Sequence, residues 1–151
     1  MGVKHSPLGA AMTDLILQTF RLNGLLLSEG DRLTKGLGLT SARWQVMGAL
    51  ADGPLTAAQI ARNMGLRRQS VQRLVDLLET ENIVVFEPNP HHRSAMLVRL
   101  TEEGQRKYAR ISQVQARWVN GLSLGFEVRK IENAVALLRD VQTRLQQSRK
   151  T

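Results

Sequence analysis

The sequence contains no cysteine. This absence excludes disulfides, thiol nucleophiles, thiol-based redox sensing and cysteine-ligated metal sites. Long apolar runs are also missing, since no stretch approaches the roughly 18 unbroken apolar residues of a membrane-spanning helix. Polar residues such as Thr13, Asp14 and Gln18 interrupt the N-terminal segment, which therefore does not match a signal peptide. We expect a cytoplasmic protein that does not interact with a membrane.

Patterns typical of enzymes are missing as well. The chain shows no nucleophile with a positioned base, no paired carboxylates and no glycine-rich phosphate loop. We interpret Gly104, Gly121 and Gly125 as helix punctuation. The adjacent histidines His91 and His92 lack an acidic cluster nearby, so they do not form a metal site. We expect a protein that is not an enzyme and that needs neither a cofactor nor a metal.

Positive charge is what the chain has in excess. Its 151 residues include 21 Lys and Arg against 13 Asp and Glu, which gives a formal net charge of +8. An excess this large favours an anionic partner, either nucleic acid or a membrane surface. The alternative is a basic surface that serves no partner. The hydrophobic content of 42% is ordinary and is sufficient for a folded core.

Most of the chain shows helical periodicity. Apolar spacing predicts a long helix over residues 9–34, and Thr40 is placed to cap a second helix in SARWQVMGALA. In LTAAQIARNMG, Thr56 has Gln59 three residues later, which is the pattern of a capping box. Gly65 then supplies the left-handed conformation that ends this third helix.

A fourth helix must follow at once, in LRRQSVQRLVDLLETE. Its apolar residues Val71, Leu74, Val75 and Leu78 have the i, i+3, i+4, i+7 spacing of a buried stripe. Two short helices joined by a tight glycine-containing turn form a helix-turn-helix. Basic, amide and hydroxyl side chains gather at the start of the second helix. They are Arg67, Arg68, Gln69, Ser70, Gln72 and Arg73.

Cations are unusual at a helix N-terminus, because the aligned peptide dipoles already place positive charge there. With a polyanionic partner the dipole and the arginines act together. The N-terminal half of a recognition helix enters the major groove, where Gln and Arg suit base edges and a Ser suits a phosphate. We therefore predict that these six residues bind double-stranded DNA. The alternative is an amphipathic helix with a solvated polar face.

A β-hairpin is predicted directly after this helix. Two β-rich runs, Ile83–Phe86 and Met96–Leu100, flank a turn that contains Pro88, Asn89 and Pro90. A hairpin in this position is a wing. Its tip reads His-His-Arg, and Arg93 is suited to a narrow minor groove or to a phosphate. For the two histidines the alternative is a plain solvated loop.

The segments LTSARWQVMGAL, LTAAQIARNMGLRRQSVQRLVDLLETENIV and VRLTEEG, together with the wing, resemble the MarR family of bacterial transcriptional regulators over roughly residues 39–104. The resemblance implies a homodimeric winged-helix regulator, usually a repressor, that binds an inverted-repeat operator. It also implies a small-molecule effector, in many relatives an aromatic or lipophilic anion that weakens DNA binding. The alternative is a winged-helix module that binds another protein without sequence-specific DNA binding.

Two features qualify the resemblance. The family wing carries an acid just before its arginine, and often a second arginine after it, where this chain has His92 and Ser94. The orientation of Arg93 is therefore open, although His92 can supply a hydrogen bond instead. The family's ligand cavity lies between the dimer helices and the winged domain. Four residues correspond to it, and we interpret them as core rather than as a site: Phe20, Trp44, Met47 and Tyr108.

The flanking helices are predicted to form a dimer. After Thr101 a fifth helix runs to about Asn120, and a last helix carries one apolar stripe. The stripe consists of Val128, Ile131, Val135, Leu138, Val141 and Leu145. We expect a mainly α fold with a small β-hairpin wing. A winged helix-turn-helix domain (residues 39–100) would be flanked by a helical dimerisation region (1–38 and 101–151). The alternative for the flanks is an intrachain helical hairpin.

Overall fold

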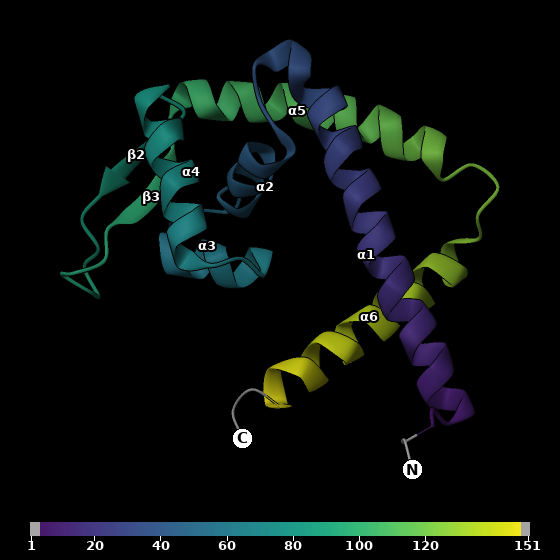
Figure 1. Cartoon of the computed structure of the whole chain (residues 1–151). Helices are drawn as coiled ribbons and strands as arrows, with labels where there is room; N and C mark the ends of the chain where they lie inside the picture. The colour runs from purple at the N-terminus through teal and green to yellow at the C-terminus, as the bar shows by residue number, and fades with distance from the viewer. Residues whose placement is uncertain (1–3, 149–151) are drawn as a thin grey trace. The chain divides into compact units, whose positions relative to one another are not determined.

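The computed structural model describes residues 4–148. The chain divides into two units, up to Gln115 and from Ala116 onward, and each is described by itself. Helices dominate, and a three-stranded antiparallel sheet carries the wing (Figure 1). The elements are α1 (Pro7–Thr34), the 3-10 turn η1 (Lys35–Leu37), α2 (Ser41–Ala49), β1 (Leu55–Thr56), α3 (Ala57–Met64), α4 (Arg68–Thr80), β2 (Val84–Glu87), β3 (Leu97–Leu100), α5 (Glu102–Leu122) and α6 (Val128–Ser148).

Helix α1 begins two residues before the predicted start. The Ser6 hydroxyl accepts a hydrogen bond from the Gly9 backbone N–H at 3.0 Å, and Pro7 fits the first turn because it has no N–H to satisfy. At its other end, the Thr34 hydroxyl donates to the Leu39 carbonyl at 3.0 Å. Gly38 has φ of +68°, so a left-handed residue ends η1 and turns the chain toward α2.

The end of α1 packs closely on the start of α2. The Ser41 backbone N–H donates to the Asp31 carboxylate at 2.7 Å, and a Cβ added to the buried Gly30 would lie 2.6 Å from the Ser41 hydroxyl. The predicted cap is confirmed, since the Thr40 hydroxyl accepts from the Arg43 N–H at 3.3 Å. The last turn of α1 and the first turn of α2 are therefore fixed to each other.

The helix-turn-helix prediction is confirmed. Val71, Val75 and Leu78 of α4 are buried, and Leu74 is half-buried against the same core. This core draws its buried apolar side chains from the segment between Leu39 and Ile111.

The sheet contains one strand more than the sequence predicts. Its order is β1-β3-β2, and both pairs are antiparallel. The β2–β3 hairpin is confirmed, with each strand beginning one residue later than expected. The additional strand, β1, consists of Leu55 and Thr56, which pair with Val98 and Leu97. A two-residue strand has no periodicity of its own, so its pairing is visible only in the fold.

The structure corrects the interpretation of Gly104 and Gly121 as residues that begin or end a helix, because both lie inside α5. Thr101 caps α5 as predicted, because its hydroxyl accepts from the Gly104 N–H at 3.0 Å. Gly104 is buried inside the first turn, and Gly121 lies inside the helix near its end at Leu122. Of the three glycines, Gly125, with φ of +83°, alone lies in the connection to α6. Gly104 is required for packing, because a Cβ there would collide with the Ile83 carbonyl oxygen.

Large apolar side chains are exposed on both terminal helices. On α1 they are Leu8, Ile16, Leu17, Phe20, Leu22, Leu25, Leu26 and Leu27. On α6 the predicted stripe is exposed at every position except the half-buried Val141. The interpretation of Phe20 as core is therefore wrong, since 71% of it is exposed, whereas Met47 is buried and Trp44 and Tyr108 pack against the core. Within residues 4–148 no helix combines the length and hydropathy needed to cross a membrane.

We expect Gly104→Ala to lower the free energy of unfolding by about 1–3 kcal/mol, the usual cost of overpacking. The Ile83 carbonyl cannot easily retreat, because it accepts the Thr101 N–H at 3.0 Å. Gly121→Ala in the same helix is the matched control. Its Cβ would meet nothing within 4 Å, so helix propensity should raise stability slightly. Urea denaturation measures both, and equal effects would contradict the packing role of Gly104.

Candidate nucleic-acid interface

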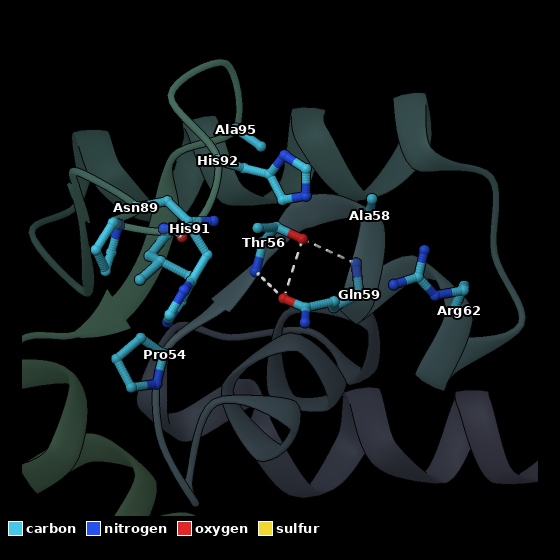
Figure 2. Close-up of a pocket in the computed structure, with 11 residues that line it drawn as sticks. Pro54, Thr56, Ala58, Gln59, Arg62, Asn89, His91, His92 and Ala95 are labelled. Atoms are coloured by element: carbon cyan, nitrogen blue, oxygen red, sulfur yellow. Dashed lines mark hydrogen bonds between the residues drawn. The ribbon is translucent and has the colours of Figure 1, made fainter.

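Helix α3 is fixed at both ends by groups that the sequence identified. The Thr56 N–H donates to the Gln59 side-chain oxygen at 2.8 Å, and the Gln59 N–H donates to the Thr56 hydroxyl at 3.2 Å. Figure 2 shows this capping box. At the other end, Gly65 has φ of +67°, and the Leu66 N–H donates to the Ala61 carbonyl at 2.9 Å. The start of α4 is placed by this turn.

Helix α4 begins on two arginines that contribute no cap. Arg67 is the N-cap residue, yet its side chain makes no capping hydrogen bond, and Arg68 is the first helical residue. Both side chains are exposed, as are those of Gln69, Ser70 and Arg73. The N-terminal half of α4 therefore presents cations where the helix dipole is already positive.

These arginines are also electrostatically unpaired. Within residues 4–148, Arg67, Arg68 and Arg73 take part in no ion pair. Two carboxylates, one at the other end of α4 and one in the wing, pair with different arginines. Glu81, which caps the C-terminus of α4, lies 3.0 Å from a guanidinium nitrogen of Arg43, and Glu87 of β2 lies 3.0 Å from Arg99 of β3.

Gln72 differs from the other predicted residues of α4. It is half-buried, and its amide nitrogen donates to the Asp76 carboxylate at 2.8 Å. Asp76 lies one turn later on the same helix and is exposed. One N–H and the side-chain oxygen of Gln72 remain for another partner.

The wing loop is folded by local hydrogen bonds. The Asn89 side-chain oxygen accepts from the His91 N–H at 3.0 Å, and the Ala95 N–H donates to the His92 carbonyl at 3.2 Å. Arg93 is exposed, and in the part of the chain that the structure describes it has no hydrogen bond to His92. His92 therefore does not take over the role of the family's acidic residue as a hydrogen-bond partner of Arg93. Arg93 projects from the tip as an unpaired cation.

A groove of about 660 Å³ separates α3 from the wing loop. Its polar lining residues are Thr56, Gln59, Arg62, Asn89, His91 and His92. In the view of Figure 2, Arg62 and His91 lie on either side of the Thr56–Gln59 cap. Residues separated by about thirty positions meet here because Thr56 pairs with Leu97 at the base of the wing. Sequence reasoning missed Arg62 and the groove, although Arg62 belongs to an arginine-rich run, RNMGLRRQSVQR.

The described residues hold no group of three or more His, Asp or Glu side chains placed to bind a metal ion. The two histidines of the wing have no acidic neighbour among the groove residues. The chemistry that the surface offers is that of an anion-binding face, with guanidinium, amide and hydroxyl donors and few acceptors.

The family model of the MarR family matches residues 37–93, which include α2, the helix-turn-helix and most of the wing. In sequence, an uncharacterised protein of Mycobacterium tuberculosis is 37% identical over 99 residues, which cover 66% of this chain and 69% of that protein. The transcriptional activatory protein BadR of Rhodopseudomonas palustris is 28% identical over 116 residues, covering 74% of this chain and 66% of BadR.

Solved structures share the fold. The transcriptional regulator BldR of Sulfolobus solfataricus matches with a TM-score of 0.79 at 17% identity, over 93% of this chain and 99% of BldR. CouR of Rhodococcus jostii, crystallised with p-coumaroyl-CoA, matches with a TM-score of 0.72 at 23% identity, over 85% of this chain and 91% of CouR. The mainly helical fold with a small antiparallel sheet is thus that of known winged-helix regulators.

Proposed function

The chain belongs to the MarR family and has the fold of its transcriptional regulators, and we propose that it binds an inverted-repeat operator as a homodimer and represses transcription. The observation that carries this proposal is the N-terminal half of α4. Its arginines are exposed and unpaired at a helix end that is already positive. Such an arrangement costs folding energy without an anionic partner, and a DNA duplex supplies that partner.

The residues of α4 divide into two roles. Arg73 and Gln69 lie on the exposed face, opposite the buried stripe, and can make bidentate hydrogen bonds to guanine and adenine edges. Arg67, Arg68 and Ser70 lie at the helix start, where contacts to phosphates position the helix. Gln72 keeps its bond to Asp76 and reaches a base with its remaining N–H and oxygen.

Arg93 acts at a distance from α4. It is exposed at the wing tip, and an arginine is the side chain best suited to a narrow minor groove. Because no carboxylate precedes it in this chain, its contact depends on the DNA itself for orientation. We therefore assign Arg93 to backbone or minor-groove binding rather than to sequence reading.

The exposed apolar faces of α1 and α6 support the homodimer. Contiguous exposed apolar surface on a folded chain marks an interaction site, and a second copy is the partner that two-fold symmetry provides. Such a dimer would place two recognition helices about 34–36 Å apart, one turn of DNA. Residues 1–38 and 101–151 would then form the dimerisation region, and residues 39–100 the DNA-binding domain.

A small anion is the proposed signal. The chain has no cysteine for oxidant sensing, and residues 4–148 offer no metal-binding cluster. CouR, which shares the fold, was crystallised with p-coumaroyl-CoA, an anionic aromatic compound. We propose that an aromatic or lipophilic carboxylate binds this chain and releases it from DNA. BadR is named for activation, so in vitro transcription with and without the protein decides the direction of regulation.

We expect Arg73→Ala and Gln69→Ala to reduce discrimination between the operator and random DNA, by about 1–3 kcal/mol for each lost base contact. Arg93→Ala should weaken binding to all sequences and lower the salt slope by about one unit. Selection from a random duplex pool supplies the operator, and fluorescence anisotropy measures the affinities. If the wild-type chain selects no sequence, the alternative of a protein-interaction module is favoured. Equal weakening of operator and random DNA by Arg73→Ala would refute its role as a base reader.

We expect Val135→Glu to dissociate the dimer, because it places a charge on the exposed apolar stripe of α6. The matched control is Asn133→Glu, which adds the same charge to an exposed residue on the opposite face of the helix. Sedimentation at micromolar concentration should show a dimer for the wild type and the control and a monomer for Val135→Glu. A wild-type monomer would contradict the dimer.

We expect an aromatic or lipophilic carboxylate to dissociate the protein–operator complex, while its uncharged amide, micromolar peroxide and chelators leave the complex intact. The effector must bind the DNA-incompetent state more tightly, by the same free energy by which it weakens operator binding. Titration of the labelled operator complex with each compound tests this. Release by peroxide or by a chelator would identify a different class of sensor.

A further inference from the structure

The α3–wing groove, defined above by its polar lining residues Thr56, Gln59, Arg62, Asn89, His91 and His92, is not among the predicted DNA contacts. Its ionisable lining groups come from both walls, Arg62 from the last turn of α3 and the two histidines from the wing loop. Among the described residues that line it, none carries a carboxylate. Every charge that the groove can acquire is therefore positive.

Both walls of the groove are held by hydrogen bonds within each wall. The capping box fixes the first turn of α3, and Ala58 of that turn opens onto the groove, so the positive end of the helix dipole faces it. The wing wall is fixed by the hydrogen bond from the His91 N–H to Asn89. Arg62 has no ion pair within residues 4–148. Arg62 and the two histidines thus line the groove from two sides.

The position of the groove identifies its occupant. Helix α3 leads through a three-residue turn, Gly65–Arg67, into α4, which we place in a major groove, and the wing tip is placed in a neighbouring minor groove. A sugar-phosphate strand separates a major groove from the adjacent minor groove, so it must pass between these two elements. The groove opens to the surface, so a DNA strand can reach it.

We propose that the α3–wing groove holds a phosphodiester of the DNA backbone, bound by Arg62 and by His91 and His92. This inference rests on the proposed function. Arg62 contributes a permanent charge, whereas an imidazole contributes one only when it is protonated. A phosphate beside an imidazole favours the protonated form. DNA binding should therefore take up protons at the wing and tighten at lower pH.

Two pairs of variants test the proposal by anisotropy with operator and random duplexes. Arg62→Gln is compared with Arg110→Gln, which removes the same charge from an exposed residue of α5. The double variant His91→Asn, His92→Asn is compared with His5→Asn, which replaces the third histidine, ahead of α1. Salt is varied at fixed pH and pH at fixed salt, and urea denaturation checks that each variant is folded.

The proposal expects Arg62→Gln to weaken operator and random DNA by the same factor and to lower the salt slope by about one unit. Wild type should bind more tightly at pH 6 than at pH 8, by up to about tenfold per pH unit for each proton taken up. The double histidine variant should lose this gain and His5→Asn should keep it.

Several results would overturn the proposal while leaving the proposed function intact. One is an Arg62→Gln variant with the same DNA affinity and salt slope as Arg110→Gln. Another is a pH response of DNA binding that survives in the double histidine variant. Calorimetry with inorganic phosphate and no DNA separates the two sources of phosphate. Millimolar binding that is lost in Arg62→Gln, together with unchanged DNA binding by that variant, would assign the groove to a free anion instead. Wild type that binds no duplex at all would overturn both proposals.

Discussion

Thr56 belongs to two elements at once, and the arrangement of the candidate interface depends on this. As the last residue of β1 it pairs with Leu97 at the base of the wing, and as the N-cap of α3 it exchanges hydrogen bonds with Gln59. The same residue therefore ties the helix-turn-helix to the wing. Gly65 then sets the direction of the turn after α3. The position of the start of α4 therefore depends on Thr56, where β1 and α3 join. The α3–wing groove is the space that the joint leaves open.

The ion pairs of the described residues leave the arginines at the start of α4 unpaired. Arg43 and Arg99 engage Glu81 and Glu87, which lie at the far end of α4 and at the edge of the sheet. Partly exposed pairs of this kind contribute little to stability, typically about 1 kcal/mol or less each. Neither pair involves an arginine from the start of α4. Asp76 lies on α4 itself, and its bond to Gln72 places a negative charge at the edge of the exposed face of that helix.

Features that depend on neighbours in sequence could be predicted, and features that depend on distant contacts could not. The caps at Thr40, Thr56 and Thr101 and the buried stripe of α4 require only a few adjacent residues, so their patterns are visible in the sequence. Strand β1, the groove and the packing of Gly104 each depend on a segment far away in the chain. The glycine shows the difference, because its residue type suggested a helix break, while its actual constraint is a carbonyl from residue 83. Which side chains contact DNA is equally non-local and stays a prediction.

The winged helix-turn-helix and the terminal helices α1 and α6 differ in how far their apolar side chains are buried. The buried core is formed within the segment from Leu39 to Ile111, so it closes without help from a second molecule. Helices α1 and α6 leave large apolar side chains exposed, and burying that surface would be favourable. In a homodimer the spacing of the two recognition helices would then be set by the helices that depend on association, not by the self-sufficient core. An interface of that kind can shift between packing arrangements while each winged helix-turn-helix domain keeps its shape. An effector would therefore need to change only the spacing of the two winged domains, and the residues of α4 proposed to read bases would not have to respond to it.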